Sequence, residues 1–293
     1  MAIMIYYRVI MLPVLLDLKF LKIYTNGIFL MLAFFWATFL IWRNVRMTSY
    51  KEEDVFDGIF LGLAGGLFIG RLFYVIINFE EFGFDILKFV LINGYPGMSV
   101  WGVIIGTLVT FYLFFSSRKI DFKEIIDYFI SPIFLALSFG KLGSFFSGSE
   151  VGSKTDFFLK MKFPGHEGMR HLTSFYEAVV FAIAAYLAYK LLFEIRKEKY
   201  GHGFLLAFFL WVFSFTYFIF DKLKAPTLYL QGYSFNLVMS GALLLTMSFY
   251  FIYYKRQTIS NFITKYGQKT ISKIRNASKR KTSGGEAKKP HSN

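Results

Sequence analysis

Cysteine is absent from this chain of 293 residues. Its absence excludes a disulfide framework, a thiolate nucleophile and a metal site built on cysteine. Charged residues are scarce, at 18% against roughly 25% in an average soluble protein. The chain also lacks the His-Glu-x-x-His pattern of zinc enzymes, the phosphate-binding Gly-Lys-Ser/Thr loop and the Gly-x-Ser-x-Gly elbow of hydrolases. We therefore expect no metal and no cofactor.

Apolar residues are correspondingly abundant and gather in long runs. They make up 55% of the chain, and 39 Phe and 19 Tyr dominate an aromatic share of 21%. A helix needs about 20 predominantly apolar residues to cross the hydrocarbon core of a bilayer. Seven segments meet or approach that length: about 26–43, 55–77, 98–116, 126–147, 173–193, 203–221 and 232–254. The sequence therefore predicts an all-α membrane protein with seven transmembrane helices.

Lysine and arginine predict how these helices are oriented, because loops rich in both residues stay preferentially in the cytoplasm. The loops after the first, third and fifth segments, together with the C-terminal tail, carry 20 Lys and Arg residues. The N-terminal segment and the alternate loops carry 10. We therefore expect the N-terminus outside and the C-terminus in the cytoplasm.

The segments that flank the seven-helix domain, residues 26–254, differ from it in composition. Residues 1–25 are apolar but are interrupted by proline and by charges, which favours an N-terminal arm lying in the membrane interface. Residues 255–293 hold eleven basic residues against one acid. This basic cytoplasmic tail is expected to bind anionic membrane lipid and not nucleic acid.

Small residues recur every four positions in three of the predicted helices, which places them on one face of each helix. The second, third and fourth segments carry Gly62, Gly66 and Gly70, then Gly102 and Gly106, then Ala136, Gly140, Ser144 and Gly148. Close helix packing is the simplest role of such a stripe. We expect these three segments to form a compact centre.

Polar side chains from six elements fall at the outer end of the predicted helices. They are Asn26, Arg71, Ser99, Lys141, Ser144, Ser147, Arg170, His171 and Asp221. Charges are costly in hydrocarbon, so these residues are expected to face a polar cavity or one another. One interpretation is a cationic pocket for an anionic headgroup. The other is a structural ion pair of Arg71 or Lys141 with Asp221, or snorkelling of the two cations to the interface.

Two residues near the fifth segment also have an ordinary interpretation. Ser174 and Glu177 fit a capping box at the start of a helix, in which the glutamate serves the backbone instead of a site. His171 follows Arg170 in a loop, where a histidine needs no special role. Both interpretations stay open beside a functional one.

Four short motifs follow one another along the chain. Residues 70–75 are similar to Gly-Arg-Leu/Ile-x-Tyr-Val, and residues 97–106 to Gly-Met/Leu-Ser-Phe-His-Gly-Gly-Leu-Ile-Gly. Residues 140–152 are similar to Gly-Arg-Ile-Gly-Asn-Phe-Ile-Asn-Gly-Glu-x-x-Gly, and residues 170–177 to Arg-His-Pro-Ser/Thr-Gln-Leu-Tyr-Glu. From about residue 24 to 254, this order and the seven spans resemble the prolipoprotein diacylglyceryl transferase family of the bacterial cell (inner) membrane.

Several positions depart from the family's pattern. Trp101 stands at the family's His, Lys141 at its signature Arg, and Ser144 and Ser147 at its two Asn. Ser149 aligns with the signature Glu, although Glu150 is adjacent. In the sixth span Tyr217 stands at an Arg and Asp221 at a Glu, and Asn26 stands at a Tyr in the first.

The resemblance implies transfer of a diacylglyceryl group from phosphatidylglycerol to a cysteine in the signal segment of a lipoprotein precursor. The thiol must lose its proton, and the leaving phosphate must be stabilised by cations. The resemblance implies His171, Glu177 and Asp221 as catalytic residues, and Arg71, Lys141, Ser144, Arg170 and Tyr176 as binding residues for the phosphatidylglycerol headgroup.

Two alternatives remain open from the sequence. The replaced motif positions are also compatible with a non-catalytic relative that binds lipid or serves as a scaffold. A transporter or channel would instead place polar residues through the membrane depth and show repeated halves, which this chain does not.

Overall fold

The structure is a computed structural model that describes residues 11–92, 94–224, 229–230 and 233–256. The basic tail from residue 257 onward and the first ten residues of the predicted arm lie outside the described residues. The chain divides into two compact units, residues 1–244 and 245–293.

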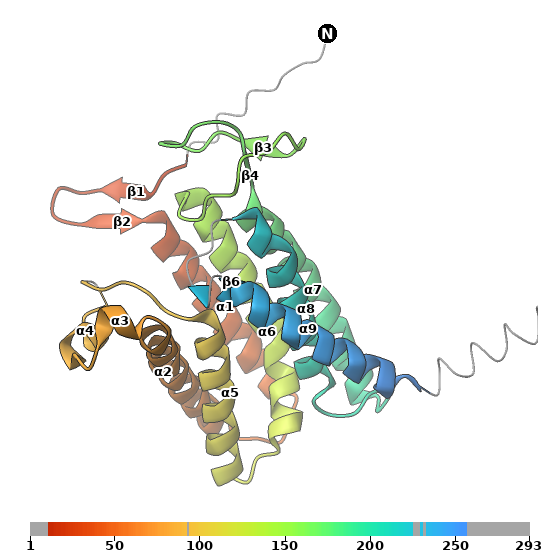
Figure 1. The fold of residues 1–293 in the computed structure, drawn as a ribbon. Coiled ribbons are helices and arrows are strands. Elements are labelled where there is room, and N and C mark those ends of the chain that lie inside the picture. Colours follow the sequence, from red (N-terminus) through yellow and green to blue (C-terminus); the bar gives the residue numbers. More distant parts are fainter. Residues whose placement is uncertain (1–10, 93, 225–228, 231–232, 257–293) are drawn as a thin grey trace, which may run out of the picture. The chain divides into compact units, whose positions relative to one another are not determined.

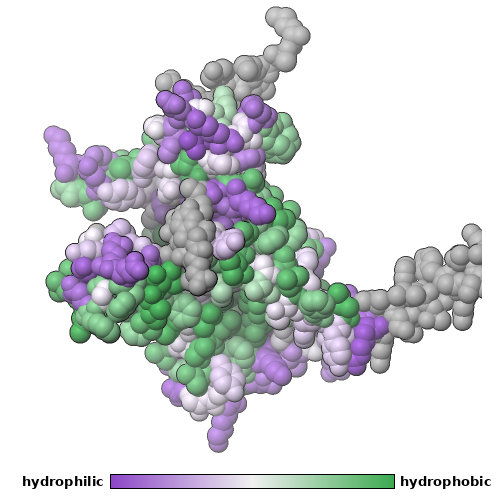
Figure 2. Space-filling model, in the orientation of Figure 1, coloured by the Kyte–Doolittle hydropathy of each residue, from purple (hydrophilic) through white to green (hydrophobic). Residues whose placement is uncertain are grey.

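Seven helices of the described residues are long and apolar enough to cross a membrane (Figure 1), which confirms the predicted all-α architecture. They are α1 (Thr25–Val45), α2 (Glu52–Ile77), α5 (Val100–Ser117), α6 (Phe122–Ser147), α7 (Thr173–Arg196), α8 (Phe204–Phe220) and α9 (Phe235–Tyr254). On the face shown in Figure 2, hydrophobic residues cover the middle of the helices and hydrophilic residues gather at their ends. This distribution fits a multi-pass membrane protein.

The connecting segments contain short elements. Two short helices, α3 (Phe79–Phe82) and α4 (Ile86–Val90), join α2 to α5, and the turn η1 (Asp221–Leu223) follows α8. Three antiparallel strand pairs are present in the described residues: β1 (Val14–Asp17) with β2 (Lys22–Tyr24), β3 (Lys160–Met161) with β4 (Arg170–His171), and β5 (Tyr229–Leu230) with β6 (Tyr233–Ser234). The first pair falls in the predicted arm.

Helices α2 and α5 pack closely through their glycines. A Cβ atom added to Gly66 would lie 2.2 Å from Thr107 Oγ1, and one added to Gly102 would lie 2.9 Å from Gly70 Cα. Neither distance leaves room for a side chain, so the two backbones approach each other as the spacing of small residues predicts.

Helix α6 packs instead between α1 and α7. Asn44 Nδ2 of α1 donates to the Tyr128 carbonyl 3.0 Å away, and Ser138 Oγ donates to the Ala178 carbonyl of α7 at 2.9 Å. Near the other end of α6, a Cβ on Gly143 would lie 2.6 Å from Phe29 Cβ. The prediction that the second, third and fourth spans form one centre is therefore wrong for the fourth. Gly143, which contacts α1, lies outside the predicted stripe, and a Cβ on Gly140 of the stripe would meet no atom within 4 Å among the described residues.

A buried carboxylate of α6 also holds the start of α8. Asp127 is fully buried, and its two oxygens accept hydrogen bonds from the backbone N–H groups of Gly203, at 2.8 Å, and Leu205, at 3.0 Å. The first N–H groups of a helix have no partner within the helix. Asp127 supplies that partner from a neighbouring helix and so fixes α8 against α6.

The second unit is described only from residue 245 to 256, the last turns of α9 and the residues after it. Tyr250 and Tyr254 stack there with ring centroids 6.0 Å apart, and the Arg256 guanidinium lies 4.0 Å from the Tyr253 ring centroid.

Candidate functional site

Two lysines and two glutamates meet at one end of α6, α7 and α8. This Lys–Glu cluster consists of Lys141, Glu150, Glu177 and Lys224. Lys141 Nζ lies 2.7 Å from Glu177 Oε2 and 2.8 Å from Glu150 Oε2, and Lys224 Nζ lies 2.6 Å from Glu177 Oε1. Glu177 has no exposed surface, and the Lys141 side chain is 11% exposed. The two positive and two negative charges thus form a compact group with no net charge.

The end of α6 explains how two cluster residues meet. Lys141 lies in the last turns of the helix, and Gly148 ends it in the left-handed conformation, with φ at +69°. Glycine adopts this conformation without steric cost. The chain therefore turns back, and Glu150 reaches Lys141 of the same helix end. Ser174 Oγ of α7 donates to Glu150 Oε2 at 3.1 Å and holds the carboxylate there.

Lys224 reaches the cluster from the segment after α8. Its backbone pairs with Gly152 in an isolated β-bridge, and Ser153 N donates to the Leu223 carbonyl at 2.7 Å. Asp221, three residues earlier, accepts a 2.5 Å hydrogen bond from Ser234 Oγ. The loop after α6 and the segment after α8 are thus joined directly beside the cluster.

The Tyr217 ring of α8 lies close to both lysines, and the Trp101 ring of α5 lies beside Tyr217. Lys141 Nζ and Lys224 Nζ are 5.7 Å and 5.3 Å from the Tyr217 ring centroid, within reach of a cation–π attraction. The Trp101 ring lies beside Tyr217, with centroids 6.2 Å apart. Trp101 is 2% exposed, and its Nε1–H has no hydrogen-bond partner among the described residues. A buried donor therefore remains unused next to the cluster.

The lysines keep Glu150 ionised. Burial, the largest single influence, raises the pKa of its carboxyl, but the charges of Lys141 and Lys224 and the hydrogen bonds from Lys141 and Ser174 outweigh it. Together they lower the pKa of Glu150 to about 2 from an ordinary value of 4.5. At neutral pH Glu150 is a carboxylate.

This lowered pKa predicts a loss of stability in acid that depends on Glu150. A carboxyl whose pKa is lower in the folded state contributes stability above its unfolded pKa, and that contribution disappears as the pH falls from about 4.5 toward about 2. We expect the midpoint of thermal unfolding in detergent to fall over this window. The fall should be smaller in Glu150→Gln, which has no proton to gain at that position. An equal fall in both proteins would contradict the prediction.

Arg170 and His171 lie on the same joined segments. Arg170 Nη1 donates to the Gly152 carbonyl at 3.0 Å, and His171 N donates to the Ser153 carbonyl at 3.1 Å. Arg170 Nε and His171 Nδ1 are buried and have no hydrogen-bond partner in the described part of the chain. The Tyr176 ring lies 6.3 Å from the His171 ring, and the Tyr176 hydroxyl donates to the Leu159 carbonyl. Two buried nitrogens without partners in the described residues thus lie on the loop that also carries Glu150.

Arg71 has a different set of partners. Its Nε, Nη1 and Nη2 donate to the carbonyls of Phe89, Gly97 and Lys88 at 3.0, 2.7 and 2.8 Å. The residue is 2% exposed. Three of the five N–H groups of the guanidinium therefore hold the connection between α2 and α5.

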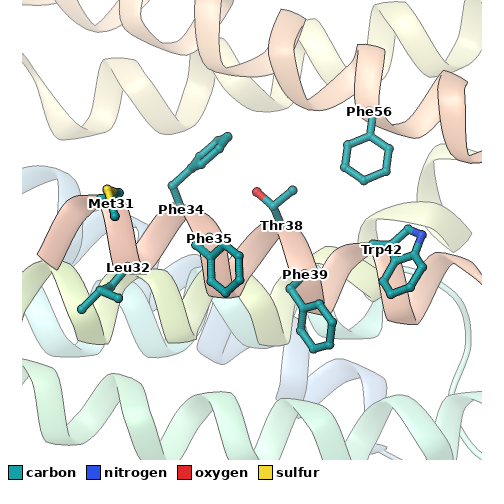
Figure 3. Close-up of a pocket in the computed structure, with 8 residues that line it drawn as sticks. All are labelled: Met31, Leu32, Phe34, Phe35, Thr38, Phe39, Trp42 and Phe56. Atoms are coloured by element: carbon teal, nitrogen blue, oxygen red, sulfur yellow. The ribbon is translucent and has the colours of Figure 1, made fainter. Parts of the chain in front are cut away.

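An apolar cavity of about 640 Å³ lies along α1. In Figure 3, Phe34 and Thr38 point from α1 toward the side from which Phe56 of α2 approaches. The residues that line this cavity are Met31, Leu32, Phe34, Phe35, Thr38, Phe39, Trp42 and Phe56. No charged side chain lines it, so the cavity offers no group that could bind an ionic headgroup.

Comparison with known proteins shows to which family this chain belongs. The model of the family described as prolipoprotein diacylglyceryl transferase matches residues 13–253. The chain belongs to the prolipoprotein diacylglyceryl transferase family. It is 30% identical over 202 residues to the phosphatidylglycerol–prolipoprotein diacylglyceryl transferase of Clostridium tetani, covering 66% of this chain and 78% of the relative. It is 28% identical over 258 residues to the protein of that name from Chlorobaculum tepidum, covering 80% and 86%.

Of the site residues that the family resemblance implied, the structure brings Lys141 and Glu177 into contact. It ties Arg170 and His171 to the loop that carries Glu150, and Ser144 supplies that loop with a carbonyl that accepts from Ser149 N at 3.1 Å. Arg71 donates to backbone carbonyls and Asp221 accepts from Ser234, so neither residue belongs to the Lys–Glu cluster.

Two interpretations of the sequence are wrong. No ion pair in the described residues joins Lys141 or Arg71 to Asp221, because Lys141 pairs with Glu150 and Glu177. The capping box is absent as well. The residue that precedes α7 is Leu172, and the Ser174 and Glu177 side chains both serve the cluster.

Sequence reasoning missed Lys224 and left Glu150 undecided. Lys224 stands outside every motif, and only its position three residues after Asp221 in a short loop hinted at the outer end of the helices. For Glu150 the signal was present. The aligned Ser149 is exposed, and the adjacent glutamate points to Lys141 instead.

Proposed function

We propose that this protein transfers the diacylglyceryl group of phosphatidylglycerol to the thiol of a cysteine in a lipoprotein precursor. The observation that carries the proposal is the buried Lys–Glu cluster, which lies at the ends of three spans of a chain that belongs to the transferase family. Both relatives described above are named for phosphatidylglycerol and prolipoprotein, which are the two substrates proposed here.

The reaction forms one bond and breaks another at the same carbon. The cysteine sulfur attacks the glycerol carbon that carries the phosphate, and a thioether bond forms. The bond between this carbon and the phosphate oxygen breaks, and glycerol phosphate leaves with the electron pair. Its charge changes from −1 to −2, so cations in a site of low dielectric stabilise the transition state more than the ground state. Lys141 is the proposed cation, as a point charge on a flexible stem.

The thiol proton needs an acceptor, and His171 is the residue proposed for it. Its Nδ1 is buried and has no hydrogen-bond partner in the described residues, and a neutral imidazole has one ring nitrogen that can accept a proton. Glu177 is proposed to hold the lysines in place, since both of its oxygens already bind ammonium groups. Asp221 is proposed to position the segment of Lys224 through Ser234.

The remaining headgroup contacts are proposed from the same region. Arg170, Ser144 and Tyr176 lie on the segments that flank the cluster, and Arg71 keeps two N–H groups beyond those given to carbonyls. The greater number of basic residues on the other side supports an outward-facing site in the inner membrane of a bacterium. The basic tail is proposed to bind anionic lipid at the cytoplasmic surface.

A mass shift tests the reaction directly. The full-length protein in detergent is mixed with phosphatidylglycerol and a peptide that carries a signal-like apolar segment and one cysteine. We expect a diacylglyceryl thioether on the peptide and an equal amount of glycerol phosphate. The same peptide with serine for cysteine should remain unmodified, because a hydroxyl is far less acidic than a thiol. Bound phosphatidylglycerol without product would refute the transfer reaction and favour a lipid-binding relative.

A further inference from the structure

We propose that Lys224 is a second phosphate-binding residue of this site, beside Lys141. The inference rests on the proposed transfer reaction. Lys224 lies outside every motif, yet its side chain is only 14% exposed, and its Nζ lies 2.6 Å from Glu177 Oε1 and 3.6 Å from Glu150 Oε2. A lysine ammonium is rarely buried unless it is paired, so this position is held by specific contacts.

The charge balance of the cluster requires Lys224. Without it, Lys141 alone would face Glu150 and Glu177, and the group would carry a net charge of −1. Such a group repels the phosphodiester that must approach it. With Lys224 the cluster is neutral. The phosphate then meets two ammonium groups, which can bind the charge of −2 that it carries on leaving.

The geometry of Glu177 indicates how a phosphate is held. One carboxylate oxygen binds Lys141 and the other binds Lys224, so the two ammonium groups are spaced to grip two oxygens on one centre. Two oxygens of a phosphate present a similar pair of acceptors. Both Nζ atoms also lie against the Tyr217 ring, which keeps them together when a ligand draws them away from the carboxylate.

The backbone of Lys224 fixes its position relative to the rest of the site. The β-bridge to Gly152 links it to the loop that contains Glu150, and Arg170 Nη1 donates to the carbonyl of that same glycine. Lys224 therefore approaches the phosphate from the segment after α8, whereas Lys141 approaches from α6. Two cations on separate elements can enclose a headgroup that enters between them.

Replacing Lys224 with glutamine or with arginine separates the effect of its charge from its effect on the structure. We expect Lys224→Gln to lower kcat/KM for transfer about 10²- to 10³-fold, as the loss of one stabilising donor does elsewhere. Lys224→Arg should stay within about tenfold of the wild type, because it retains the charge. Lys222→Gln is the matched control. Lys222 lies two residues away and 5.9 Å from the Phe218 ring centroid, outside the cluster, and its loss should leave kcat/KM unchanged.

A double variant distinguishes direct phosphate binding from charge balance alone. Lys224→Gln with Glu150→Gln restores a neutral group of Lys141 and Glu177. It should unfold near the wild-type temperature and remain at least about 10²-fold less active. If Lys224→Gln fails to fold, the activity of the double variant is measured in its place. Wild-type activity in the double variant, or in Lys224→Gln itself, would overturn the proposal.

The failure of the proposed function is separable from the failure of this inference. If the wild type makes no thioether, the transfer reaction is refuted, and the Kd for phosphatidylglycerol measured without peptide still reports on Lys224. The inference expects at least about tenfold weaker binding in Lys224→Gln than in Lys222→Gln. Equal Kd values in the two variants would overturn it.

Discussion

Replacing Lys141 with glutamine is expected to lower kcat/KM for diacylglyceryl transfer by about 10³-fold, the largest effect on activity that the site predicts. Lys141 contacts both carboxylates of the cluster, and its side chain is 11% exposed. The substitution removes one of two cations and leaves Glu177 buried with Lys224 as its single partner. Breaking a buried ion pair in this way costs about 3–5 kcal/mol, so the midpoint of thermal unfolding should fall as well.

A second substitution tests whether Lys141 binds the phosphate or serves only as the structural ion-pair partner of Glu177. Glu177→Gln removes the partner, and the double variant Lys141→Gln, Glu177→Gln removes both charges. We expect the double variant to recover part of the lost stability, because no unpaired charge remains. It should recover no activity, because the phosphate then lacks the ammonium group of Lys141 and Lys224 alone cannot replace it. Recovery of transfer in the double variant would show that Lys141 is only a structural ion pair. Lys141→Arg, which retains the charge, should stay within about tenfold of the wild type.

Arg71→Ala is expected to cause the largest loss of stability. The substitution leaves the carbonyls of three half-buried residues, Lys88, Phe89 and Gly97, without their donor, and an unsatisfied group costs about 1–3 kcal/mol where it is buried. We expect a loss of about 3–6 kcal/mol, seen as a fall of at least about 6 °C in the unfolding midpoint. Transfer should be slower as well, because Gly97 is followed four residues later by Trp101, whose ring lies beside Tyr217.

Arg71→Lys is the matched variant for this test. Lysine retains the positive charge but cannot donate to three carbonyls in the planar arrangement of a guanidinium. We expect it to be nearly as unstable and inactive as Arg71→Ala, because three hydrogen bonds to carbonyls must hold the guanidinium before its remaining N–H groups can reach the headgroup. Wild-type stability and activity in Arg71→Lys would instead show that the positive charge alone matters at this position and that the three hydrogen bonds are dispensable.

The positions of the seven helices were predictable because hydrocarbon imposes a simple requirement on sequence. Each span must hide its polar backbone in a helix and must be apolar over about 20 residues. The structure places α1 at Thr25–Val45 and α7 at Thr173–Arg196, close to the predicted 26–43 and 173–193. The packing of α2 on α5 followed equally from Gly62, Gly66 and Gly70, because a face without side chains admits a close neighbour.

The partners of the charged residues were not predictable in the same way. Lys224 and Glu177 are 47 positions apart, and Lys141 and Glu177 are 36 apart. No periodicity connects residues of different helices, so each charge had several candidate partners at the same membrane depth. The predicted membrane depth made Asp221 a candidate partner of Lys141, but Asp221 accepts a hydrogen bond from Ser234 instead.

The sequence by itself determined the spans and the end of the helices at which polar groups gather, since both depend on the transfer of residues from water to lipid. Only the tertiary structure decided which charges meet. The left-handed turn at Gly148 returns Glu150 to Lys141, and the bridge to Gly152 delivers Lys224 to Glu177. A buried ion pair requires contact within about 4 Å, and such distances are set by how the chain packs, not by how far each residue lies along it.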